Sequence, residues 1–285
     1  MINQLNMDNN FKKITGVKSF AFKQAFPGLR SVDIFAHQYP IEPFLVFTEY
    51  YMDKPVFGPH PHAGISVLTY MLPDSKESFI NRDSNGDFST IEPGGLHITQ
   101  AGSGIHHDEF PTGNGYEAHG FQIWINHAEN DRMVAPKAIH ASADQVKEVH
   151  TPDATVRILH GAFQHNRTDY QLKTDVTLLH VLVKPNQTII LDAKEMAFVY
   201  TLTGGGVIDD ANLTKHQLIN FSEAGTAIKI SAGAEGFSFM FASAKPLNEP
   251  IVYGGPFVMT TTEQMNETKR NYASGKMGEL APYHI

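Results

Sequence analysis

The sequence contains no cysteine among its 285 residues. Disulfide bonds and thiolate metal ligands are therefore excluded, and a bound metal must be held by His, Asp, Glu or backbone oxygen. No run of about 18 apolar residues is present, so we expect no helix that spans a membrane. Clusters of Lys and Arg are missing too, and the formal net charge of −8 argues against direct binding to nucleic acid.

The N-terminal residues show no secretory signal. Residues 1–13 are polar and contain no apolar segment of the kind found in secretory signals. We expect this stretch to form a loose tail and the protein to be cytoplasmic.

The composition is that of a globular protein. Hydrophobic residues make up 41% and charged residues 18% of the chain. The length allows two domains of ordinary size, each with a full core.

Short segments rich in β-branched and aromatic residues follow from Ile14 onward. Residues 65–72 (ISVLTYML) and 121–125 (FQIWI) are typical of strands, and turn signals such as residues 84–87 (SNGD) recur every eight to twelve residues. This pattern predicts an all-β fold, an antiparallel sandwich or barrel. We expect few helices: residues 141–149, as the connection between domains, and residues 262–274.

The second half of the chain resembles the first. Residues 197–202 (AFVYTL) resemble residues 67–72 (VLTYML), and each segment precedes a turn. Aligning Tyr200 with Tyr70 places Ile190 and Asp192 where His60 and His62 stand. The repeat predicts two similar β-barrels, of which only the first binds metal.

Candidate metal ligands occur as two pairs at i and i+2. The first pair is His60 and His62, and the second is His107 and Glu109. On a strand this spacing puts both side chains on one face, so two neighbouring strands can enclose one ion. From spacing alone the second pair can equally be read as His106 and Asp108.

Three imidazoles and a carboxylate suit Fe, Mn, Ni, Co or Zn, and they leave positions for substrate oxygen and for dioxygen or water. The alternative is that these are ordinary polar residues in a chain with 15 histidines. The second pair lies behind two Gly-containing turns in one β-rich region, and this favours the metal site.

Residues 57–126 resemble the pirin family of the cupin superfamily. The matching segments are residues 59–64 (PHPHAG), 82–86 (RDSNG), 93–96 (PGGL), 101–109 (AGSGIHHDE) and 121–126 (FQIWIN), with 249–251 and 255–259 further downstream. The resemblance covers most of the chain from about Pro43.

The resemblance implies a bicupin, two antiparallel barrels of the double-stranded β-helix or jelly-roll type. Residues 1–138 would form the N-terminal barrel with the metal, and residues 139–285 a metal-free C-terminal barrel with a tail. The ligands it implies are His60, His62, His107 and Glu109. It also implies that the chain termini pack onto the opposite half. We expect one divalent transition metal, Fe(II), with Ni, Co, Mn, Cu or Zn as alternatives.

The activity implied is that of a quercetin 2,3-dioxygenase, in which a flavonol-like aromatic substrate reacts with dioxygen and Glu109 accepts a proton as the catalytic residue. The alternative is a metal- or redox-sensing regulator that binds a protein partner such as a transcription factor or a metabolic enzyme.

Two residues depart from the family pattern, and three aromatic residues are candidates for the pocket. Ser66 stands where many pirins carry Glu, and His97 where Gln is usual, so we expect either to alter substrate preference. His97 is a candidate partner of the ligands. The pocket candidates are Phe57, Phe110 and Trp124.

Overall fold

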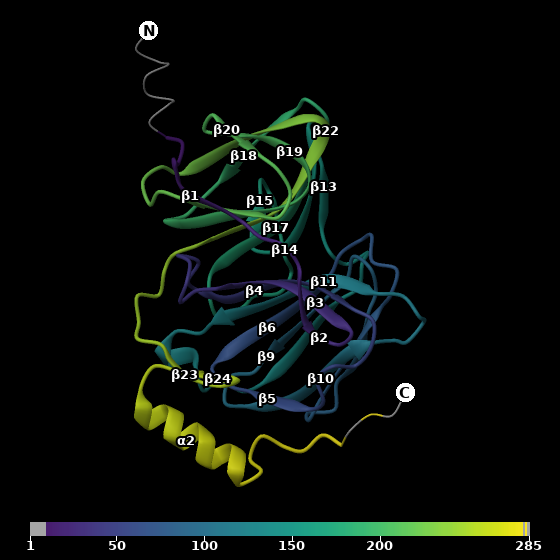
Figure 1. The fold of residues 1–285 in the computed structure, drawn as a ribbon. Coiled ribbons are helices and arrows are strands. Elements are labelled where there is room, and N and C mark those ends of the chain that lie inside the picture. Colours follow the sequence, from purple (N-terminus) through teal and green to yellow (C-terminus); the bar gives the residue numbers. More distant parts are fainter. Residues whose placement is uncertain (1–9, 282, 284–285) are drawn as a thin grey trace.

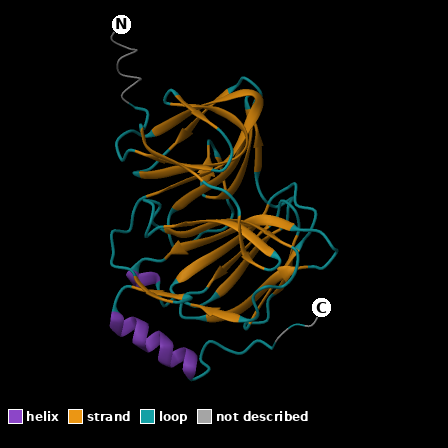
Figure 2. Ribbon diagram, viewed as in Figure 1, coloured by secondary structure: helices purple, strands orange, loops and turns teal. Residues whose placement is uncertain are grey.

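The structure, a computed structural model, describes residues 10–281 and 283. It consists mostly of antiparallel strands and confirms the predicted all-β class (Figure 2). The strands are β1 (Ile14–Ser19), β2 (Lys23–Phe26), β3 (Leu29–Phe35), β4 (Phe44–Met52), β5 (His60–His62), β6 (Ile65–Met71), β7 (Phe79–Asp83), β8 (Phe88–Ile91), β9 (Leu96–Gln100), β10 (Ile105–Pro111), β11 (Ala118–Asn126), β12 (Lys137–Ala141), β13 (Glu148–His150), β14 (Ala154–His160), β15 (Ala162–Phe163), β16 (Asn166–Arg167), β17 (Val176–Val183), β18 (Thr188–Asp192), β19 (Met196–Ile208), β20 (Ala211–Leu213), β21 (Gln217–Phe221), β22 (Ala227–Ala244), β23 (Val252–Gly254) and β24 (Phe257–Met259). The helices are a 3-10 turn at Glu129–Asp131 and α2 (Thr262–Ala273).

The N-terminal barrel is built from two sheets. The larger has the strand order β12-β9-β6-β11-β4-β3-β2, and the smaller has the order β5-β10-β7-β8. The two candidate ligand segments, β5 and β10, are neighbours in the smaller sheet. The larger sheet provides the opposite wall of the barrel interior.

The C-terminal barrel repeats this connectivity. Its main strand order is β1-β21-β19-β22-β17-β14-β13, with β18 paired to β22. The long strand β22 pairs with β18 at its start, from Ala227 to Ser231, and with β19 from Ser231 to Ala244, as β10 pairs with β5 and β11 with β6 in the first barrel. The predicted two-barrel repeat is therefore confirmed.

Each end of the chain packs on the opposite barrel, as the resemblance implied. In Figure 1 the purple strand β1 lies among the green strands of the C-terminal barrel, where it pairs with β21. The yellow segment of β23, β24 and α2 lies against the N-terminal barrel (Figure 1), and Phe257 forms a bridge with Ala63 beside β5.

Buried Arg132 holds the C-terminal segment in place. Its guanidinium donates to the hydroxyl of Thr260 at 2.6 Å and to the carbonyl of Val258 at 3.1 Å. The same group also donates to Asn126 in the N-terminal barrel at 2.9 Å. One cation thus satisfies acceptors from both parts of the chain.

A single apolar core lies between the barrels. Phe44 and Phe47 of β4 pack against Phe198 of β19, with ring centroids 5.6 and 5.2 Å apart. Tyr70 and Tyr200 belong to the same buried cluster. The two barrels therefore share one core at their interface rather than touching through exposed surfaces.

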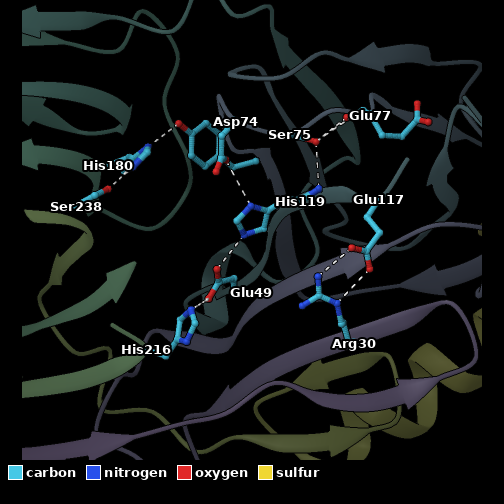
Figure 3. Close-up of polar contacts among 11 residues, drawn as sticks. Arg30, Glu49, Asp74, Ser75, Glu77, Glu117, His119, His180, His216 and Ser238 are labelled. Carbon is cyan, nitrogen blue, oxygen red and sulfur yellow. Dashed lines mark hydrogen bonds and ion pairs between the residues drawn. The ribbon is translucent and has the colours of Figure 1, made fainter. Parts of the chain in front are cut away.

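A polar network crosses the same interface (Figure 3). Glu49, only 2% exposed, accepts hydrogen bonds from Tyr200 of the other barrel at 2.7 Å and from His119 at 2.9 Å. His119 lies between Glu49 and Asp74, with its Nδ1 3.4 Å from the Asp74 carboxylate. The His216 ring, from the C-terminal barrel, lies 3.9 Å from Glu49.

One of the two expected helices is correct. Helix α2 begins at a capping box, in which the Thr261 hydroxyl accepts from the Gln264 backbone and the Gln264 side chain accepts from Thr261. The helix expected at residues 141–149 is wrong. Its ends are strand residues, because Ala141 pairs with Leu96 and Val149 with Val156, and these sheet pairings override a weak helical pattern.

The loose tail expected at residues 1–13 is wrong where it can be assessed. Residues 1–9 lie outside the described part of the chain, but the buried Lys12 ammonium donates to the carbonyls of Glu195, Ser222 and Glu223. The boundary placed between residues 138 and 139 stays a prediction. Near it, β12 pairs with β9 and β13 pairs with β14. Neither described helix is long and apolar enough to cross a membrane.

Candidate metal centre

Three of the predicted ligands meet where β5 and β10 run side by side. His60 lies directly opposite His107 in the antiparallel register. One ring nitrogen from each of His60, His62 and His107 lies within 4.8 Å of the others. Among the described residues this is the only such group of three or more His, Cys, Asp or Glu side chains.

The two faces of β10 decide between the two readings of its sequence. His107 and Glu109 face the barrel interior, and both are buried. Asp108 faces the other way and forms a buried ion pair with Arg82 at 2.7 Å. His106 lies on that outer face too, with its ring centroid 5.5 Å from that of Tyr272 in α2.

Hydrogen bonds at Nδ1 set the tautomers of two of the histidines. His60 Nδ1 donates to the carbonyl of Gly58 at 2.8 Å, and His62 Nδ1 donates to the carbonyl of Pro256 at 3.1 Å. A carbonyl can only accept, so in the neutral rings Nε2 carries the lone pair. Nε2 of His60 lies 3.1 Å from Nε2 of His107. Metal-binding histidines commonly use their second nitrogen in this way.

Burial keeps these imidazoles neutral. It lowers the pKa of His60 and lowers the pKa of His62 to about 3, where the neighbouring His60 adds a smaller effect. Burial also lowers the pKa of His107, assisted by the other two histidines. Neutral imidazole is the form that ligates a metal, so the group fits a divalent cation at neutral pH.

Glu109 lies in the same cavity but outside the close group of three nitrogens. Its carboxylate accepts from the Thr69 hydroxyl at 2.5 Å and from the Gln122 amide at 3.0 Å. Burial raises the pKa of Glu109 to about 7, although the two hydrogen bonds act in the opposite direction. A carboxyl group with such a pKa can hold or release a proton near neutrality.

Three of the candidate ligands, His60, His62 and Glu109, line a cavity of about 890 Å³ inside the N-terminal barrel. Of the predicted pocket residues, Phe57 and Trp124 line it, and the ring centroid of Trp124 lies 4.8 Å from that of His62. Phe110 does not line it. Phe110 shares the outer face of β10 with Asp108 and stacks on Tyr283 with centroids 5.3 Å apart.

Ser66 and His97, the two residues that depart from the family pattern, do not line the cavity. Ser66 is buried and bonds to Nε2 of His127 at 2.8 Å. His97 is fully buried and stands opposite Thr69 in the sheet, with its nearest carboxylate, Asp87, 3.9 Å away. Burial lowers the pKa of His97 to about 4. His97 is therefore a neutral residue beside Thr69, outside the lining of the cavity.

The C-terminal barrel carries no equivalent ligand set on β18 and β22. Ile189 and Leu191 are the inward residues of β18, and they pair with the inward Ile230 and Ile228 of β22. Ile190 is 52% exposed, so the alignment that placed Ile190 and Asp192 at the ligand positions was wrong by one residue. A one-residue slip in a strand reverses the face of every side chain.

Three further residues that contact the candidate ligands were not identified from the sequence. Thr69 and Gln122 are polar residues at inward positions of β6 and β11, and their alternation with apolar neighbours was the available signal. Pro256 contributes only a backbone carbonyl, which no side-chain pattern reveals.

Comparisons with known proteins match both barrels of the chain. The pirin family model matches residues 13–125, and the model of the pirin C-terminal cupin domain matches residues 178–278. A pirin-like protein of Arabidopsis thaliana is 29% identical over 263 residues, covering 87% of this chain and 84% of that protein. Human pirin is 26% identical over 245 residues, covering 84% of this chain and 83% of its own.

Solved structures show the same fold. A quercetin 2,3-dioxygenase from Acinetobacter baumannii superposes with a TM-score of 0.85 at 23% identity, covering 95% of this chain and 100% of its own. The bacterial pirin YhhW from Escherichia coli, in complex with nickel(II), superposes with a TM-score of 0.66 at 17% identity, covering 81% and 99%.

Proposed function

The chain belongs to the pirin family of the cupin superfamily, and from this we propose that it is a metal-dependent dioxygenase of the quercetin 2,3-dioxygenase type. Its substrate would be a flavonol or a similar flat aromatic molecule, with dioxygen as co-substrate. The observation that carries the proposal is the group of three neutral imidazoles, two of which, His60 and His62, line a large, mainly apolar cavity. The dioxygenase fold neighbour supports it.

The metal would be held by His60, His62, His107 and Glu109. We propose Fe(II), with Ni, Co, Mn, Cu or Zn as alternatives, since imidazole and carboxylate donors suit all of these ions. The nickel complex of a structural neighbour supports a transition metal in this fold. When bound, such an ion would polarise a substrate hydroxyl and lower its pKa.

Glu109 would accept the proton released by that hydroxyl. Its carboxylate is buried, and burial holds its pKa near 7, so it can take up a proton at neutral pH. Thr69 and Gln122 each bond to one of its oxygens, and this fixes the direction of the remaining lone pairs.

The aromatic walls would bind and orient the substrate. The exposed face of Phe57 and the indole of Trp124 lie near the histidines, with the ring centroid of Phe57 6.2 Å from that of His60. Apolar walls exclude water from the reacting ring, and a flat molecule held there has few orientations.

The first test compares two adjacent histidines. We expect the native protein to bind about one equivalent of transition metal and His107→Ala to bind none, because the variant removes the central imidazole. His106→Ala is the matched control, since His106 lies on the outer face of β10 and should retain metal. Elemental analysis after reloading measures all three proteins.

Flavonol turnover is then assayed with the loaded proteins. Quercetin consumption by the native protein and His106→Ala, but not by His107→Ala or Glu109→Ala, would support the dioxygenase. A native protein that cannot be loaded with metal would overturn the site and the activity together. Metal-dependent capture of a protein partner without turnover would favour the regulatory alternative.

A further inference from the structure

A row of polar side chains crosses the inner wall of the N-terminal barrel. Thr69, Gln122, Thr48 and Asp33 come from four adjacent strands, β6, β11, β4 and β3, and each stands directly opposite the next in the register. Directly opposed residues in antiparallel strands project from the same face. The row begins at Glu109, which bonds to Thr69 and Gln122, and it ends at Asp33.

Asp33 is held in a fixed orientation at the far end of this row. The Ser31 hydroxyl donates to one carboxylate oxygen at 2.8 Å, and the Thr48 hydroxyl donates to the other at 2.9 Å. Asp33 is exposed, lines the cavity and has no cationic partner among the described residues within 4.0 Å. Each oxygen therefore keeps a lone pair for a further donor.

Beyond Ser31 and Thr48, the cavity wall around Asp33 is mainly apolar. Phe35 is the next residue on the same face of β3, and Val46 lies opposite Phe35 on the neighbouring strand β4. The Asp33 carboxylate is therefore a directional hydrogen-bond acceptor in a mainly apolar wall. Small-molecule sites usually obtain their specificity from a few polar groups placed in this way.

The separation of Asp33 from the Glu109 end of the row suits one flat molecule. Asp33 lies two strands from Gln122, which bonds to Glu109, and two strand spacings correspond to about 10 Å. A flavonol with its central-ring hydroxyl near Glu109 can direct its pendant ring toward Asp33. Phe26 and Phe57, whose rings meet edge to face at 5.6 Å, also line this cavity.

We propose that Asp33, oriented by Ser31 and Thr48, is the residue that selects substrates with hydroxyl groups on the pendant ring. The inference rests on the proposed function for the orientation of the ligand, with the hydroxyl of its central ring at the histidines. The preferred class is flavonols with two adjacent hydroxyls on the pendant ring. Both hydroxyls can donate to one carboxylate, much as paired donors of other groups do.

A flavonol without those hydroxyls binds less well for a physical reason. Its pendant ring displaces water from Asp33 and supplies no donor in return, so a charged acceptor loses hydrogen bonds on binding. Hydrogen bonds to charged groups are strong enough that we expect a preference of about tenfold or more for the dihydroxylated ring.

The single tryptophan makes binding measurable without turnover. Trp124 is the only Trp in the sequence and lines the cavity, so quenching of its fluorescence reports occupancy. The probes are quercetin, which has two adjacent pendant-ring hydroxyls, and the otherwise identical flavonol with an unsubstituted pendant ring. Each is titrated into metal-loaded and metal-free native protein, Asp33→Asn and Asp169→Asn.

We expect Asp33→Asn to lose the preference for quercetin while it still binds the unsubstituted flavonol. Native protein prefers quercetin about tenfold, and Asp33→Asn binds both probes with the weaker affinity. Equal binding of the unsubstituted probe by native and variant shows that the variant is folded. Asp169→Asn, which makes the same change at an exposed surface ion pair, keeps the preference. In steady-state assays Asp33→Asn raises KM for quercetin and leaves kcat within about twofold, since Asp33 would contact the pendant ring and not the hydroxyl that lies at the histidines.

The outcomes separate this inference from the proposed function. Equal affinity of native protein for both probes, or a preference that survives in Asp33→Asn, overturns the role of Asp33. A preference that depends on Asp33 in metal-free and metal-loaded protein alike, without turnover, supports Asp33 and overturns the dioxygenase. Binding of neither probe overturns both.

Discussion

At the scale of single residues, His119 links protonation to stability. Burial opposes its charged form, but hydrogen bonds and charges from Asp74 and Glu49 outweigh burial and raise its pKa. A raised folded-state pKa stabilises the fold fully below the unfolded value of about 6.5 and loses that contribution as pH rises through the folded value. The network of Figure 3 is therefore strongest in mildly acidic solution.

We predict that His119→Gln lowers the free energy of unfolding by about 1–3 kcal/mol at pH 6, because buried Glu49 loses a charged partner. The loss should shrink as pH rises above the folded pKa of His119. Denaturant unfolding of native protein and variant at pH 6, 7, 8 and 9 measures it. His165→Gln, at an exposed histidine, should follow the native curve. If the stability difference between native protein and His119→Gln grew with pH, it would contradict a positive charge on His119 in the folded protein.

The directions of side chains explain how much of the site was predictable at this scale. Spacing at i and i+2 grouped His60 with His62, and the structure places both at one point with His107. Spacing could not choose between the faces of β10. That choice depends on Arg82, which lies 26 residues away in sequence and binds Asp108. Partners brought together by folding carry no local signal.

At the scale of elements, the hairpin of β23 and β24 fits closely against β5. Gly64 adopts a φ of 79°, and a Cβ there would lie 1.8 Å from the carbonyl oxygen of Val258. No side chain can be accommodated without moving the hairpin. The hairpin turn also carries Pro256, whose carbonyl orients His62.

We predict that Gly64→Ala destabilises the protein and weakens metal binding, although Gly64 has no ligand atom. The collision displaces the hairpin and with it the acceptor of His62; loss of such supporting contacts typically reduces metal affinity about 10- to 100-fold. Gly86→Ala is the matched control, because its φ of 96° imposes backbone strain but nothing lies within 4 Å of a Cβ. Thermal melts and competition with a chelator measure both effects.

The Gly86→Ala control shows how much destabilisation comes from backbone strain alone. Gly86→Ala should cost only about 1–2 kcal/mol, the strain of a left-handed residue, and should retain native metal affinity. If Gly64→Ala matched it in both measurements, the hairpin would have no part in orienting His62.

Elements were predictable where the signals were local. Strands β6 and β11 follow from apolar stretches bounded by turns, and α2 from an amphipathic pattern near the C-terminus. The segment at residues 141–149 shows the opposite case. Its few helix-favouring residues were outweighed by pairing with β9 and β14, which lie far from each other in sequence.

At the scale of the whole molecule, the two barrels are packed into one unit. They share the aromatic core around Phe47 and Phe198, and each chain end adds a strand or hairpin to the opposite barrel. The sequence repeat indicated two barrels but not this exchange. Pairing of β1 with β21 joins residues about 200 positions apart, and nothing near β1 specifies that partner.

We predict a single unfolding transition. Trp124 reports only the N-terminal barrel, whereas far-ultraviolet circular dichroism reports strands of both. The two signals should have the same midpoint in denaturant. Phe198→Ala removes a fully buried ring from the shared core and should shift both midpoints together, by about 3–5 kcal/mol in stability. Separate midpoints would show that the barrels unfold independently.

The contact between His62 and Pro256 also bears on protein synthesis. A ribosome releases the strands that carry the histidines long before it reaches residue 256, and N-terminal parts of a chain fold first. Until then His62 lacks the carbonyl that sets its tautomer, and the hairpin that packs against Ala63 is absent. The finished geometry of the histidines is therefore a late event of biogenesis, and a metal that requires this geometry would be bound by the completed polypeptide and not by the nascent one.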